Sequence, residues 1–182
     1  MNQENRQNQT FFVRKGIELE VDGANRQFRD KLLDELVGNW DVTGKVAGEL
    51  LLHSCTVDWI LSHQFLRIHF LDVGSKSHQR KNAGRDDHAP YEAMVFVGYD
   101  NMSERYVVHW LDIFGGRFSE TLGYGKRKDK NSIRFLFEGG TGPLHNTFAW
   151  NPLKRTWSMV IDQKDAKGKW TRFASESFQR IS

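Results

Sequence analysis

Gly38-Asn39-Trp40 is the stretch at which the pattern of the chain changes, and this change decides the fold. Before it, from about residue 26 to residue 37, apolar residues recur at helical spacing, and Gly38 is placed to end the helix. From Trp40 onward the period becomes two, which is typical of half-buried strands. The sequence therefore predicts one short N-terminal helix followed by a long succession of strands.

Recurring turn residues divide the rest of the chain into about ten strands. We expect them at residues 39–47, 49–61, 64–73, 91–99, 104–114, 117–125, 132–138, 144–151, 155–163 and 169–180. No crossover helices separate them, so the sheet must be antiparallel, and so many consecutive strands are expected to curl and close. The predicted fold is all-β, a closed antiparallel up-and-down barrel. Residues 1–25 are expected to form a polar tail and arm, and residues 26–182 the single barrel domain.

Composition points to one soluble domain. The chain has 182 residues, 38% of them hydrophobic, which is enough for a single sizeable core. Its 26 basic residues are spread among 23 acidic ones, and the run at 126–130 is interpreted as a solvated hairpin tip, so no nucleic-acid partner is predicted. The single Cys55 fits a reducing compartment, and no segment has the length of a membrane span. We expect a cytoplasmic protein with no membrane partner.

Hairpin geometry predicts which side chains face inward. A tight turn at Ser62-His63 pairs Asp58 with Arg67 across two strands, and the opposite, apolar face of this hairpin, which includes Trp59, is assigned to the interior. The same reasoning at the turns after Asp100 and after Phe114 gives a shared face of large rings, small residues and a few polar groups. The ligand-lining candidates are Trp59, Tyr91, Tyr106, Trp110, Asp112, Ser119 and Thr121.

Such a lumen suits a small hydrophobic or aromatic molecule, so ligand binding is the leading function and catalysis is the less favoured one. The alternative is an isomerase, cyclase or hydrolase in which Asp112, its pKa raised by an aromatic pocket, moves a proton with Tyr106 as partner. A third is a purely structural barrel, because small barrels are often filled by their own side chains. A homodimer through the outer face stays open, since many strands are apolar on both sides.

No cofactor or metal is predicted. A haem-binding barrel stays open as an alternative, for which His109 and His145 are the strand histidines available, although no histidine follows His145. The scattered histidines and the one cysteine offer no close zinc ligand set apart from a few residues of the connection 74–90, where solvation explains them. That long, charged connection is expected to be a surface excursion.

Four segments carry a resemblance to a known family: Gly38-Asn39-Trp40, Val97-Gly98-Tyr99-Asp100-Asn101, Tyr106 with Trp110-Leu111-Asp112, and Glu176-Ser177-Phe178-Gln179-Arg180. Together they resemble bacterial lipocalin-like proteins of the calycin group, a family of unknown function, over roughly residues 30 to 181. The resemblance implies a barrel that binds small hydrophobic molecules. It also implies that Trp40, after Gly38, plugs one end while Arg180 packs across its ring. The charged connection 74–90 departs from the family pattern.

Overall fold

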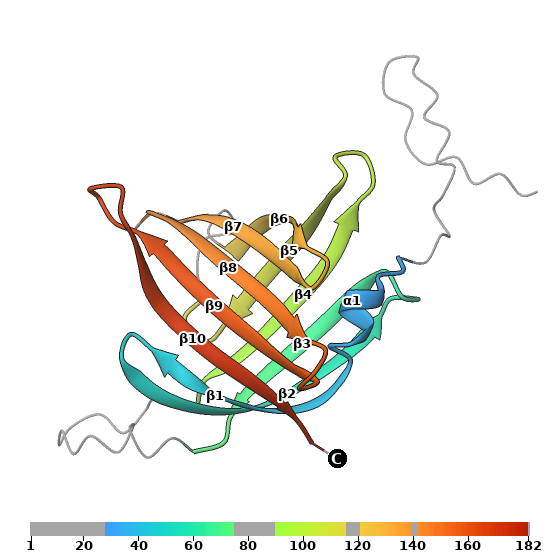
Figure 1. Ribbon diagram of the computed structural model, residues 1–182, viewed down its shortest axis with the longest axis horizontal. Coiled ribbons are helices and arrows are strands. Elements are labelled where there is room, and N and C mark those ends of the chain that lie inside the picture. The colour runs from blue at the N-terminus through green and yellow to red at the C-terminus, as the bar shows by residue number, and fades with distance from the viewer. Residues whose placement is uncertain (1–27, 75–89, 116–120, 140–141, 182) are drawn as a thin grey trace, which may run out of the picture.

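The computed structural model describes residues 28–74, 90–115, 121–139 and 142–181, so the N-terminal arm and most of the charged connection 74–90 lie outside the described residues. The described residues form a closed antiparallel barrel of ten strands, which confirms the predicted fold (Figure 1). The elements are α1 (Lys31–Asp34), β1 (Gly38–Val46), β2 (Glu49–Ile60), β3 (Phe65–Asp72), β4 (Glu92–Asp100), β5 (Arg105–Asp112), β6 (Leu122–Asp129), β7 (Ser132–Gly139), β8 (Gly142–Asn151), β9 (Thr156–Lys164) and β10 (Trp170–Arg180).

Each strand pairs with its neighbours in the sequence, and β1 pairs with β10 to close the barrel. The predicted hairpin register is confirmed, because Asp58 lies opposite Arg67 and their side chains form an ion pair at 2.9 Å. The predicted inner face of β4 and β5 is also confirmed: Val95, Val97 and Val108 are at most 1% exposed. The alternation of side chains along these strands was therefore sufficient to predict both the hairpin register and the inward-facing side chains.

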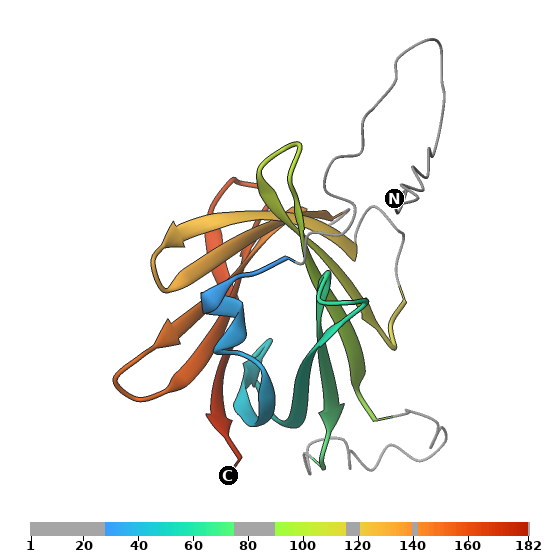
Figure 2. The same ribbon diagram turned by 90° about the vertical axis from the view of Figure 1, so that its right-hand side faces the viewer.

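α1 is shorter than the helix predicted over residues 26–37. Asp30 caps it, since its carboxylate accepts hydrogen bonds from the backbone N–H groups of Leu32 and Leu33. Phe28 and Arg29, the described residues just before Asp30, are not helical, yet the ring of Phe28 still stacks on Tyr99 at 5.5 Å. The apolar spacing in the sequence thus predicted which residues of this segment pack against the barrel, but it overestimated the length of the helix. α1 lies at one end of the barrel, which we call the helix end, and the opposite end is the far end (Figure 2).

β6 also differs from the prediction. It runs from Leu122 to Asp129 instead of over residues 117–125, and the predicted residues 117–120 lie outside the described residues. The basic residues from Lys126 onward therefore extend a strand, and Lys126 lies opposite Arg134 on β7. Two inward positions of β6 are glycines, so the sequence lacks the apolar alternation that would have revealed the strand.

β10 contains an irregularity that changes its face. Strict alternation would place Arg172 and Glu176 on the same side, but the register with β9 shifts between Arg172 and Ala174. Arg172 consequently turns outward, where its Nε lies 2.7 Å from a carboxylate oxygen of Asp162. Glu176 turns inward and is only 7% exposed. This bulge places a carboxyl group inside the barrel.

Large apolar side chains fill the helix end of the lumen. Trp40, Val42 and Phe178 are fully buried there, and the rings of Trp40 and Phe178 meet edge to face at 6.4 Å. The indole N–H of Trp40 donates to the carbonyl of Leu36 at 2.7 Å, which joins α1 to the core. This end is a packed core, so a ligand site inside the barrel must lie toward the far end.

Candidate functional site

The predicted closure of the helix end is present. The guanidinium carbon of Arg180 lies 4.2 Å from the centre of the Trp40 ring, and the same group donates to the carbonyls of Val37 and Glu35 at 2.8 Å each. Gly38 has a φ of +133°, and a Cβ at this position would lie 2.4 Å from Arg180 Nη1. Arg180 therefore both covers the tryptophan and binds carbonyls of the turn that follows α1.

Tyr106 belongs to a buried polar cluster at the helix end. Its hydroxyl donates to the carboxylate of Asp30, and Arg127 donates from Nε to the Tyr106 oxygen at 2.8 Å and from Nη2 to Asp30. Burial, reinforced by the hydrogen bond to Asp30, raises the pKa of Tyr106 to about 12. Asp112 lies six residues further along the same strand, which is about 20 Å away. The structure does not bring these two proposed catalytic groups together.

Trp59 also lies at the helix end. Its indole N–H donates to a carboxylate oxygen of Asp34 at 2.9 Å, and its ring stacks on that of His63 at 4.0 Å. The side chain is half-buried beneath α1. Trp59 is therefore placed to hold the helix against the barrel, near Tyr106 but away from Tyr91 and Trp110.

Tyr91, Trp110 and Asp112 do come together, in the far half of the lumen. Trp110 stacks on Phe70 at 5.7 Å, and Tyr91 stacks on the imidazole of His53 at 5.1 Å. Burial raises the pKa of Asp112, while hydrogen bonding from the Trp110 side chain opposes the rise. Burial and the nearby Asp112 charge raise the pKa of the Tyr91 hydroxyl. This half of the lumen is thus lined by rings and contains a carboxyl group.

The last two candidates do not join this group. Thr121 Oγ1 lies 2.9 Å from Nε2 of His109, and His109 alternates with the inward Val108 and Trp110 on β5, so it faces outward. The Thr121 hydroxyl is therefore directed toward the outer side of the sheet. Ser119 lies outside the described residues.

Three buried polar residues of the lumen were not among the predicted site residues. They are His53, Asn146 and Glu176, each at most 7% exposed and each with a side-chain atom that has no hydrogen-bond partner among the described residues. These atoms are His53 Nδ1, Asn146 Oδ1 and Glu176 Oε2. Burial raises the pKa of Glu176 to about 7 and lowers that of His53. The sequence did indicate that Glu176 faces inward, because along β10 it alternates with Phe178 and Arg180.

Contacts and charges connect these residues with the aromatic candidates. Asn146 Nδ2 lies 3.5 Å from the sulfur of Met159, and Met159 is the β9 partner of Glu176. The charge of Glu176 raises the pKa of Tyr91, as well as that of the buried Cys55. His53 and Glu176 therefore lie near Tyr91, and Asn146 lies beside the β9 partner of Glu176. We call His53, Tyr91, Trp110, Asn146 and Glu176 the lumen site.

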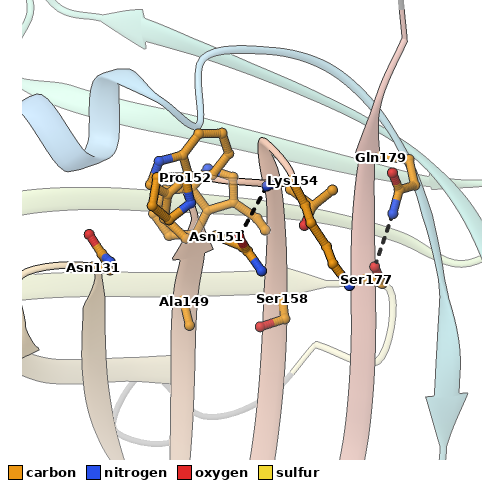
Figure 3. Close-up of a pocket in the computed structure, with 11 residues that line it drawn as sticks. Asn131, Ala149, Asn151, Pro152, Lys154, Ser158, Ser177 and Gln179 are labelled. Carbon is orange, nitrogen blue, oxygen red and sulfur yellow. Dashed lines mark hydrogen bonds between the residues drawn. The ribbon is translucent and has the colours of Figure 1, made fainter.

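Two cavities lined by described residues open on the outer surface instead. The larger, of about 540 Å³, lies across β8, β9 and β10 near the helix end (Figure 3). Several of its polar groups already bond to one another: Gln179 Nε2 donates to Ser177 Oγ at 3.5 Å, and Asn151 Oδ1 accepts from the backbone of Lys154 at 3.1 Å. The smaller, of about 280 Å³, lies over β6, β7 and β8 and is rich in cations.

The described residues contain no group of three or more His, Cys, Asp or Glu side chains arranged to hold a metal ion. His109 and His145, the histidines considered for haem, both face outward, and His145 stacks on Trp170 at 4.0 Å. No helix among residues 28–74, 90–115, 121–139 and 142–181 has the length and apolar character needed to cross a membrane.

Comparison with known proteins assigns no family to the chain. No protein-family model matches the chain, and no curated protein matches it significantly. Among solved structures the chain is similar to one titled as a redesigned beta barrel, with 12% sequence identity and a TM-score of 0.39, over 84% of this chain and 96% of that one.

Proposed function

We propose that the barrel binds a small, flat, largely apolar molecule with one polar end at the lumen site. The observation that supports this proposal best is the set of three unpartnered polar atoms, on His53, Asn146 and Glu176, beside the rings of Tyr91 and Trp110. Leaving a buried donor or acceptor without a partner costs about 1–3 kcal/mol for each group. A ligand that bonds to these atoms would recover much of that free energy.

The aromatic and the polar side chains of the lumen site would contact different parts of the ligand. Trp110 and Tyr91 offer ring faces, extended inward by Phe70, whose ring also meets that of Phe178 at 5.9 Å. Aromatic ligands stack on such surfaces with a gain of about 0.5–1.5 kcal/mol beyond area burial. Asn146 Oδ1 is an acceptor only, whereas a protonated Glu176 can donate as well as accept. The ligand end that meets them should therefore carry both an N–H or O–H group and an acceptor.

The closure of the helix end supports a relation to the lipocalin-like calycin barrels, which would make ligand binding at the opposite end the expected arrangement. Gly38, Trp40 and Arg180 occupy the positions that this relation requires. Because bulky side chains fill the helix end, the ligand would enter from the far end, where Tyr91 and Asp112 lie. Asp112 would then meet the ligand at the entrance.

The proposal is tested by native mass spectrometry of the freshly purified chain beside its denatured mass, followed by titration with the neutral dye Nile red. We expect dye binding that Trp110→Ala weakens by about 10-fold, since it removes one aromatic wall. The matched control is Leu111→Ala, which changes the next residue on the outer face and should alter affinity less than about 2-fold. Equal affinity of the two folded variants would refute a ligand site at Trp110.

A specific observation also keeps the catalytic alternative open. Glu176 has a pKa of about 7, which is suited to general acid–base chemistry near neutral pH. Once mass spectrometry has identified a ligand, Glu176→Gln separates the two functions. Loss of turnover with binding retained would establish proton transfer by Glu176, whereas a wild-type protein that returns the ligand unchanged would establish a carrier.

A further inference from the structure

Three cations on neighbouring strands form one row on the outer face of the barrel. Lys126 lies directly opposite Arg134, and the pairing of Tyr106 with Gly125 brings Arg105 alongside Lys126 on its other side. Adjacent strands are about 4.8 Å apart, so the row spans about 10 Å. Like charges directly opposite each other destabilise a sheet. This row therefore concentrates positive charge at a cost in stability.

The row borders the smaller outer cavity, of about 280 Å³. The side chains around it are Arg105, Lys126, Arg134 and His145, with Tyr124 and Leu136, and no carboxylate is among the described residues that line it. Although these basic residues are scattered through the sequence, the β5–β8 pairing gathers them at a single hollow. The cavity thus combines positive charge with an apolar floor.

The two arginines of the row are held in place by uncharged partners. The guanidinium carbon of Arg105 lies 3.6 Å from the centre of the Tyr124 ring, and Arg134 Nε donates to Thr147 Oγ1 at 3.3 Å. Because these contacts do not neutralise the guanidinium groups, their remaining N–H groups stay available to an anion. Arg105 Nε, moreover, is buried and has no hydrogen-bond partner among the described residues. An incoming oxygen atom would supply that missing acceptor.

Two nearby carboxylates form hydrogen bonds with other groups, although the pKa of Asp100 is lowered both by its hydrogen bond from Ser103 and, more weakly, by the charge of Arg105. Asp100, opposite Arg105 on β4, accepts hydrogen bonds from the backbone of Met102 and Ser103 in the following turn. Asp162, opposite His145 on β9, is paired with Arg172 at 2.7 Å. Neither carboxylate lines the cavity, so neither fills the position that an external anion would take.

We infer that this cavity is a binding site for a phosphomonoester, with the phosphate held by Arg105, Lys126 and Arg134. Guanidinium groups bind phosphate oxygens in a planar, two-point geometry, and lysine adds a compact point charge. Beyond the cations, the imidazole of His145 lies against Trp170 at 4.0 Å with the rings 9° from parallel. Together with Leu136, this pair provides a platform for the organic part of the ligand. The site is independent of the lumen site, since it lies on the other face of the sheet.

The test is calorimetric titration of the full chain with adenosine monophosphate at low ionic strength. We expect saturable binding that the double variant Lys126→Gln/Arg134→Gln weakens by at least about 10-fold. The matched control is Lys45→Gln/Lys154→Gln, which removes the same charge from exposed positions on β1 and the β8–β9 turn and should change affinity by less than about 2-fold. Inorganic phosphate should compete, and adenosine should not bind.

A second arm separates a free phosphomonoester from a lipid headgroup. Binding to phosphatidic acid vesicles but not to adenosine monophosphate, abolished by Lys126→Gln/Arg134→Gln, would assign the phosphate to a lipid. The absence of binding in both arms would overturn the inference, and so would equal weakening by the control variant. Circular dichroism of each variant establishes that the barrel is folded before the titrations are compared.

Discussion

Arg180 lies directly opposite Trp40 in the β1–β10 register, and its guanidinium covers the indole while binding two carbonyls of the turn between α1 and β1. One side chain thus joins the last strand, the first strand and the helix. The pairing therefore closes the barrel and fixes the turn between α1 and β1 at the same point.

Arg180→Ala should therefore destabilise the fold by about 2 kcal/mol, since it removes a cation–π contact and leaves the carbonyls of Val37 and Glu35 without this donor. Arg180→Lys should retain part of the stability, because lysine keeps the charge but cannot bind both carbonyls in a fork. Urea unfolding measures both. Arg172→Ala is the control: it breaks an exposed pair with Asp162 and should cost less than about 1 kcal/mol. Equal losses at the two positions would contradict a special role for Arg180.

Tyr106→Phe should destabilise the barrel by about 1–2 kcal/mol without affecting ligand binding. The substitution removes the hydroxyl that bridges Asp30 and Arg127, although those two side chains still pair directly. Since Tyr106 lies about 20 Å from Asp112 along the strand, Nile red affinity should be unchanged. Urea unfolding and dye titration of the same sample test both parts. A large loss of affinity with stability unchanged would show instead that Tyr106 belongs to the ligand site.

Alternation along the strands was sufficient to predict the barrel, because each hairpin turn fixes a register and each register fixes two faces. Asp58 opposite Arg67 and the buried Val95, Val97 and Val108 follow directly from that rule. The closure by Trp40 and Arg180 was predictable only through resemblance, since no spacing rule joins residues so far apart.

The site was less predictable, for three physical reasons. A bulge in β10 interrupts the alternation, so nothing before Ala174 indicates that Glu176 faces inward. The N-cap at Asp30 starts the helix late, and the same residue then binds Tyr106, a long-range contact that only the folded chain creates. The outer cation row joins Arg105, Lys126 and Arg134 from three strands, and local sequence cannot show that they meet.

Cys55 should resist alkylation in the folded protein. Its thiol is 1% exposed, and burial, together with the nearby charge of Glu176, raises its pKa. Because the thiolate is the reactive form, iodoacetamide should label the native protein at least about 100-fold more slowly than the urea-unfolded chain. The comparison variant carries Met102→Cys with Cys55→Ala and places the thiol at a position that is 93% exposed. Similar labelling rates for the two folded proteins would contradict the burial of Cys55.

The burial of Glu176 predicts that stability falls as pH rises. Its pKa increases from the ordinary value of 4.5 to about 7 on folding, because burial disfavours the charged carboxylate. Below pH 4.5 both states hold the proton, so ionisation of this group imposes no penalty. Between pH 4.5 and about 7 the unfolded chain releases the proton while the folded chain keeps it, and the free energy of unfolding drops by about 1.4 kcal/mol per pH unit. Above about pH 7 the charged, buried carboxylate lowers the free energy of unfolding by its full amount, about 3 kcal/mol.

Glu176→Gln isolates this effect from the other groups that face the lumen. His53, Asp112, Tyr91 and Cys55 also titrate there, but they are present in both proteins, so the difference in stability between wild type and variant reports chiefly on Glu176. We expect the variant to gain about 3 kcal/mol relative to wild type between pH 4 and pH 8, as measured by urea unfolding at each pH. Glu138→Gln, a substitution at an exposed position of β7, should show no such trend. A difference independent of pH would mean that Glu176 is charged inside the folded barrel and has a partner there, which would remove the main support for the lumen site.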